Sequence, residues 1–143
     1  MKIVRTVEVD RPVSAVFAYL SDFTTTNDWD PGTVKTTLAS GDGGVGTTYH
    51  NVSSFMGRET ELTYEVIELE PDKVFALRGE NKTLVAHDTM TFEATATGGT
   101  RMTYSADFTF KGITAFLAPL LAPAFKKLGD EAEKGLQEKL GAL

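Results

Sequence analysis

Few residues of this sequence can act as nucleophiles, metal ligands or proton-transfer groups near neutral pH. The chain has no cysteine and only two histidines, His50 and His87. Alternation along a strand over 84–96 turns Met90 and Phe92 inward and therefore His87 outward, and we expect His50 to point outward too. A zinc site needs three or four convergent ligands, and a serine–histidine triad needs a serine on the histidine's face. We therefore expect no metal, no cofactor and no nucleophilic catalysis.

The polar side chains expected on the inner faces of the strands are more informative. Alternation turns Tyr64, Asp88 and Tyr104 inward among apolar neighbours, and places Arg5 inward near the start of the chain. An apolar wall with a few hydroxyl or carboxyl groups is what a small-molecule pocket requires. Asp88 is then the one candidate for a catalytic acid or base, with the two tyrosines as proton donors. Alternatively, the tyrosines are ordinary core residues, and Asp88 and Arg5 sit at solvated strand ends.

Trp29, the only tryptophan, completes the candidate binding set. It lies between two aspartates before a proline, and it either packs a short helical turn against the sheet or gates the cavity. The residues that we expect to contact a ligand are Trp29, Tyr49, Asn51, Tyr64, Asp88, Met90, Tyr104, Phe108, Leu121 and Phe125.

Two further motifs have simpler interpretations. Residues 41–46, GDGGVG, match G-x-G-x-x-G, but a strand rather than a helix follows, so a nucleotide site is not expected. A hairpin loop fits best, with a mobile lip at the cavity mouth as the alternative. Arg78 is expected to point outward and to pair with Glu59, Glu61 or Glu65 of the neighbouring strand. A clamp for a ligand carboxylate is the other interpretation of Arg78.

The elements that position these side chains follow from periodicity. An opening strand is followed by a helix over 12–21 and a helical turn or loop, and then by some 75 residues of period-two pattern. Short turns between these strands predict antiparallel hairpins. The last 30 residues return to a helical period, although Pro119 and Pro123 confine the regular helix to residues from about 120. The strands are expected near 33–39, 46–55, 58–69, 73–80, 84–96 and 100–110, and the helical stripe comprises Leu117, Leu121, Phe125, Leu128, Ala132, Leu136 and Leu140.

Length and charge restrict the class of protein. The 143 residues predict one domain, 1–143, large enough to bury a core without disulfides. The net charge of −6 leaves no extended basic face, so nucleic acid and anionic membranes are poor partners. The longest apolar run, ITAFLAPLLAPAF, is too short to span a bilayer. We expect a soluble, cytoplasmic protein without integral membrane association, as a monomer or weak dimer.

The whole chain resembles the helix-grip superfamily of START-like and pollen-allergen-like domains. It is most similar to the bacterial polyketide cyclase/dehydrase-type branch, often called SRPBCC. The segments that carry the resemblance are VEVDRPVSAVFAYLSD (7–22), DWDPG (28–32), residues 45–80 and residues 88–112. The resemblance implies an α+β fold in which a strongly curved antiparallel sheet of about seven strands wraps around a long C-terminal helix. Short helices would lie between the first two strands, and a cavity would hold an apolar ligand such as a lipid.

Two functions follow from these expectations. The first is binding of a small hydrophobic or amphipathic molecule by a carrier or sensor. The second is a cyclase or dehydratase acting on a poly-keto or aromatic substrate in the same cavity, with Asp88 as acid or base. The absence of an inward histidine, lysine or cysteine favours binding without catalysis.

Overall fold

Seven antiparallel strands form one sheet in the order β1-β7-β6-β5-β4-β3-β2. Consecutive strands from β2 to β7 pair with each other, and β7 also pairs with β1. The period-two pattern predicted this meander. The computed structural model describes residues 1–143. The strands are β1 (Lys2–Val9), β2 (Thr33–Ser40), β3 (Thr48–Phe55), β4 (Arg58–Glu70), β5 (Val74–Glu80), β6 (Leu84–Ala94) and β7 (Thr100–Phe110), and the helices are α1 (Val13–Leu20), η1 (Phe23–Thr25), α2 (Thr26–Trp29), η2 (Gly112–Leu121) and α3 (Ala122–Gly141).

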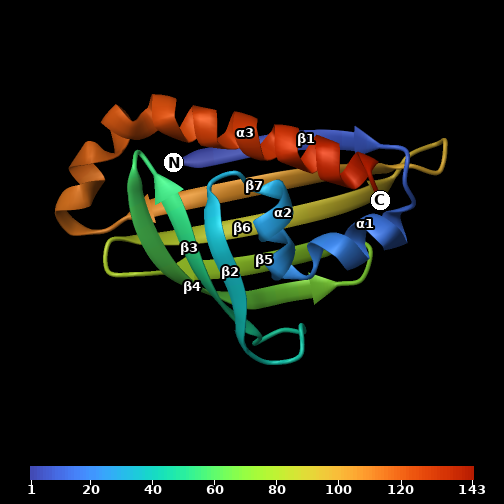
Figure 1. Ribbon diagram of the computed structural model, residues 1–143, viewed down its shortest axis with the longest axis horizontal. Coiled ribbons are helices and arrows are strands. Elements are labelled where there is room, and N and C mark those ends of the chain that lie inside the picture. The colour runs from blue at the N-terminus through green and yellow to red at the C-terminus, as the bar shows by residue number, and fades with distance from the viewer.

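The sheet curves around α3, which runs along it beside β1 (Figure 1). The short helices α1 and α2 lie between β1 and β2 in the chain, and α2 packs against α3. This arrangement confirms the predicted helix-grip α+β fold. None of the helices combines the length and apolarity needed to cross a bilayer.

The two prolines of the C-terminal segment divide it as the sequence predicts. Residues before Ala122 form the 3₁₀ helix η2, which contains Pro119. Pro123 lies in the first turn of α3, where its missing N–H would have no intrahelical acceptor. The C-terminal half of the predicted stripe is buried, with Leu136 and Leu140 fully inaccessible. The N-terminal half is different, since Leu117 is 49% exposed.

Close packing of α2 on α3 depends on a glycine. A Cβ atom at Gly135 would lie 1.8 Å from the carbonyl oxygen of Trp29, so no other residue fits here without displacement of the backbone. This contact fixes the end of α2 and therefore the position of Trp29 and of Asp30, which follows it.

The packed core occupies the end of the molecule where α1 and the last turns of α3 meet the sheet. Val16, Leu20 and Leu136 are almost inaccessible there, and Phe17 and Phe92 make an edge-to-face contact at 5.1 Å. At the other end, the first half of α3 packs on β1, where a Cβ atom at Gly129 would lie 2.5 Å from Ile3, and leaves a space between itself, η2 and the other strands. This space is the cavity described next.

Candidate functional site

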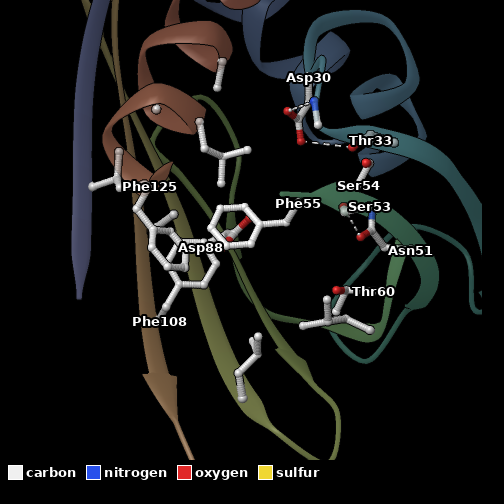
Figure 2. A pocket seen from close by; sticks show the side chains of 18 of the residues that line it. Asp30, Thr33, Asn51, Ser53, Ser54, Phe55, Thr60, Asp88, Phe108 and Phe125 are labelled. Atoms are coloured by element: carbon white, nitrogen blue, oxygen red, sulfur yellow. Dashed lines mark hydrogen bonds between the residues drawn. The ribbon is translucent and has the colours of Figure 1, made fainter. Parts of the chain in front are cut away.

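A cavity of about 540 Å³ lies between the sheet and the first half of α3 (Figure 2). Its mouth is where its lining residues are solvent-exposed, at the β3–β4 turn and η2. Met56 is 67% exposed in the turn and Leu117 lies opposite on η2. Ile113, Phe116 and Leu120 add further exposed apolar surface to η2.

One wall of the cavity is aromatic. Phe125 of α3 packs against Phe55 of β3 and Phe108 of β7, with ring centroids 4.7 and 4.9 Å apart. Phe110 approaches the same ring at 5.7 Å. Leu121 and Leu128 extend this apolar surface along η2 and α3. This wall presents apolar surface to the cavity.

The opposite wall, on β2, β3 and β4, carries hydroxyl and amide groups. Asn51, Ser53 and Thr60 line it, and Figure 2 shows them facing the aromatic wall across the cavity. Asn51 is held in place, since its amide donates to Thr36 Oγ1 at 2.9 Å and its Oδ1 accepts from Ser53 at 2.7 Å. The cavity is therefore amphipathic, with its polar groups on one side.

The inner end of the cavity contains a buried carboxyl group. Asp88 on β6 is 4% exposed. Its Oδ2 accepts a hydrogen bond of 3.1 Å from the hydroxyl of Tyr104 on β7, while Oδ1 has no partner. Burial raises the pKa of Asp88 to about 7, against the opposing effect of the Tyr104 hydrogen bond. The charge of Asp30 adds to the increase.

A second carboxyl group, on Asp30, also borders the cavity. Its Oδ1 accepts from the backbone N–H of Gly32 and its Oδ2 from the hydroxyl of Thr33, both at 3.0 Å. Burial still raises the pKa of Asp30, because desolvation outweighs these two hydrogen bonds. Asp30 and Asp88 thus place only negative charge near the inner end.

Two further aromatic residues, Tyr64 and Trp29, line the inner end of the cavity near Tyr104. Tyr64 lies on β4, and a Cβ atom at the neighbouring Gly79 would come within 2.6 Å of the Tyr64 ring, so this glycine makes room for it. Burial, with the charges of Asp88 and Asp30, raises the pKa of Tyr64 well above its usual value. Trp29 is 2% exposed, contacts the Tyr104 ring edge-on at 5.6 Å, and leaves its Nε1 without a partner. Trp29 therefore packs at the inner end of the cavity, which agrees with the first of its two interpretations, and it does not cover the mouth.

Arg5 does not reach the cavity. Its guanidinium lies beneath α3, where Nη2 donates to Asp130 Oδ1 at 2.9 Å and to the carbonyl of Lys126 at 3.3 Å. The inward orientation was correct, but β1 is the edge strand next to α3, so the side chain meets the helix instead of Asp88. Arg58, at the mouth, is the one cationic side chain among the lining residues.

The structure brings most of the predicted binding residues to the cavity but leaves two outside it. Tyr49 packs against Phe23, with ring centroids 5.6 Å apart, and Met90 is fully buried in the packed core. Alternation identifies the face of a strand, whereas the extent of the cavity along it depends on where the side chains of the helices fill the space over the sheet. The predicted residues that line the cavity are Trp29, Asn51, Tyr64, Asp88, Tyr104, Phe108, Leu121 and Phe125.

Some lining residues were missed at the sequence level. Thr60 has the same parity as Tyr64 on β4, so alternation could have identified it. Asp30 follows α2 in a segment without periodicity, so no sequence signal pointed to it. The glycine-rich loop 41–46 contributes nothing to this cavity, because it joins β2 to β3 and successive hairpin turns alternate between opposite ends of a sheet. The lip at the mouth is the β3–β4 turn at Met56.

The charged groups on the outer face form surface ion pairs. Arg78 pairs with Glu80 of its own strand at 2.9 Å, rather than with a glutamate of β4 as predicted, and Lys111 also binds Glu80. Hydrogen bonds from Arg78 and Lys111 lower the pKa of Glu80 to about 2. His50 points outward and contacts Glu61 at 3.0 Å. No three His, Asp or Glu side chains converge on a point where they could hold a metal ion.

A curved sheet around a long helix, with a cavity between them, defines the class of this protein. The sequence matches the family described as polyketide cyclase/dehydrase and lipid transport over residues 1–141, and the chain belongs to that family. The expected resemblance is thereby confirmed. No curated protein matches the sequence significantly.

Solved structures with the same fold include Zhui, an aromatase/cyclase from Streptomyces sp. R1128. It is 16% identical, with a TM-score of 0.82 over 97% of this chain and 92% of that one. TTHA0849 from Thermus thermophilus is 15% identical, with a TM-score of 0.82 over 99% and 98% of the two chains. A START superfamily protein from Mycobacterium smegmatis is 15% identical, with a TM-score of 0.74 over 99% and 94%. Identities this low establish a shared fold.

Proposed function

We propose that this protein binds a small amphipathic molecule in the cavity between the sheet and α3, as a carrier or sensor and without catalysis. The observation that supports this function is a cavity of about 540 Å³ with an aromatic wall facing a hydroxyl-bearing wall. Typical ligand sites have volumes of roughly 300–1,000 Å³ and few polar groups. A cavity within this range matches a ligand of one to three rings or a medium-length acyl chain.

The test is binding of Nile red, a neutral apolar dye, followed by its own fluorescence. We expect micromolar affinity, equivalent to roughly −8 kcal/mol. Thr60→Phe places a ring inside the cavity and should weaken binding at least about tenfold. Thr63→Phe is the matched control, because Thr63 is exposed on the outer face of the same strand. Equal affinities for the two variants, or no binding by the folded wild type, would refute the proposal.

A second candidate, a cyclase or dehydratase, is supported by the environment of Asp88. A carboxyl group with a pKa of about 7 is half ionised at neutral pH, which suits a general acid or base. Its carboxylate could take a proton from a carbon next to one ketone as that carbon attacks a distant ketone of the same chain, and Asp88–H would return the proton to the alkoxide that forms. Asp88 would then take a second proton from a carbon next to the new alcohol and deliver it to the departing hydroxyl, so that one water leaves.

Heptanetrione, a linear poly-β-ketone, tests this candidate because its cyclisation gives methylresorcinol and one water. An enzyme should accelerate appearance of the aromatic product, and Asp88→Asn should abolish the acceleration while Nile red still binds. Unchanged product formation in the presence of wild-type protein favours the carrier or sensor.

A further inference from the structure

The inner end of the cavity presents two unpaired polar groups of opposite kind. Asp88 Oδ1 is an acceptor and Trp29 Nε1 is a donor; both residues line the cavity, and neither atom has a partner in the protein. Their residues are 4% and 2% exposed. Buried polar groups are normally hydrogen-bonded, and leaving one unpaired costs about 1–3 kcal/mol. Tyr104 connects the two residues, since its hydroxyl donates to Asp88 Oδ2 and its ring contacts the Trp29 ring.

Every ionisable group around Asp88 is acidic or neutral. Tyr104 and Tyr64 face it from β7 and β4, and Asp30 from the end of α2. Glu131 of α3 adds negative charge next to Asp30. The nearest cation on β1, Arg5, is engaged by Asp130. An anionic group that entered this end of the cavity would therefore meet negative charge with no counterion.

We infer that the ligand enters with a neutral hydroxyl group leading, which donates to Asp88 Oδ1 and accepts from Trp29 Nε1, and that carboxylates are rejected. The inference rests on the proposed binding function. A hydroxyl is the simplest group that both donates and accepts, whereas an ammonium group cannot accept and a ketone cannot donate. The phenyl rings near the mouth then surround the apolar remainder of the molecule.

Protonation of Asp88 gives this selectivity a dependence on pH. An ionised Asp88 accepts from a hydroxyl, while a carboxylate ligand is tolerated only when Asp88 is protonated. Affinity for a carboxylate should therefore fall about tenfold per pH unit above the pKa of Asp88, and affinity for a hydroxyl probe should not fall.

The test uses four naphthalene probes of matched shape that displace Nile red at pH 8: naphthol, acetylnaphthalene, naphthoate and naphthylmethylammonium. We expect naphthol to bind at least about tenfold more tightly than naphthoate and several-fold more tightly than the other two. Asp88→Asn should bring naphthol and naphthoate within about threefold of each other. Trp29→Phe should weaken naphthol but not naphthylmethylammonium, which gives a second readout should Asp88→Asn fail to fold.

Glu93→Gln is the matched control, because it removes one negative charge from the outer face of the same strand and should leave all four affinities unchanged. Equal binding of naphthol and naphthoate by a wild-type protein that binds Nile red would overturn the inference and leave the proposed function intact. Tighter binding of naphthylmethylammonium than of naphthol would also overturn it, since charge alone would then govern selection. Failure of Nile red and all four probes to bind would refute the proposed function itself.

Discussion

Replacement of Asp88 by asparagine should change the pH dependence of stability in a calculable way. The pKa of Asp88 rises from 3.8 to about 7 on folding, mainly because burial disfavours the charged carboxylate. Between these two pH values the folded protein holds a proton that the unfolded chain has released. Stability contributed by this group is therefore present at low pH and is lost as the pH rises toward 7.

The magnitude follows from the same shift. Each pH unit between the two pKa values changes the free energy of unfolding by about 1.4 kcal/mol. From pH 5 to pH 7 the wild type should lose about 2 kcal/mol through Asp88, because the loss levels off as the pH reaches the folded pKa, with little further change to pH 8. Asparagine resembles the protonated carboxyl and does not titrate, so the stability of Asp88→Asn relative to wild type should rise by about 2 kcal/mol over this interval.

Urea denaturation at pH 5, 6, 7 and 8, followed by circular dichroism, measures this difference. Any constant cost of the asparagine amide group cancels because only the change with pH is used. Glu93→Gln, in the exposed outer position of the same strand, should follow the wild-type pH dependence. A difference between Asp88→Asn and wild type that stays within about 0.5 kcal/mol across the range would refute the reasoning that Asp88 is desolvated.

Three further outcomes are expected. Phe125→Ala should lower the free energy of unfolding by only about 2 kcal/mol and weaken Nile red binding, because Phe125 faces an existing cavity. Leu136→Ala, in the packed core, should lower it by about 4 kcal/mol and leave binding unchanged. Equal losses for the two variants in urea titrations would contradict this. Gly135→Ala should lower the melting temperature strongly, because the new Cβ atom would lie 1.8 Å from the Trp29 carbonyl oxygen. Gly141→Ala should not, because its Cβ atom would contact nothing. Similar melting temperatures for the two variants would disprove the contact between α2 and α3. Emission of Trp29, which borders the cavity, should be quenched as Nile red saturates the protein, and unchanged emission would show that the dye binds elsewhere.

Local patterns in the sequence determined the elements and their order. Period-two alternation and short turns were sufficient for the meander from β2 to β7, because a hairpin needs only neighbouring residues. The same alternation placed Tyr64, Asp88 and Tyr104 on the inner face, where they line the cavity. Strand ends shifted by about two residues, as at Ala94, where the Thr95 hydroxyl accepts from the Gly99 N–H and starts the turn early.

Tertiary structure decided which inward-facing residues line the cavity and which are buried in the packed core. Met90 and Asp88 have the same parity on β6, yet Met90 lies in the solid core and Asp88 at the cavity's inner end. The difference arises because side chains of α1 and of the last turns of α3 fill the space over the sheet at Met90, whereas the cavity remains open at Asp88. No pattern of neighbouring residues encodes how these helices pack on the sheet.

The charge environment of the cavity likewise depended on contacts between distant segments. Arg5 and Asp88 were both inward by alternation, but α3 placed Asp130 next to Arg5 and so removed its charge from the cavity. The segment after α2 brought Asp30 to the inner end in its place. Alternation within a strand specifies the direction of a side chain, because that direction is set by the backbone of a few residues. Its partner and its desolvation are set by segments as many as 125 positions away, as for Arg5 and Asp130, and only the folded chain brings these together.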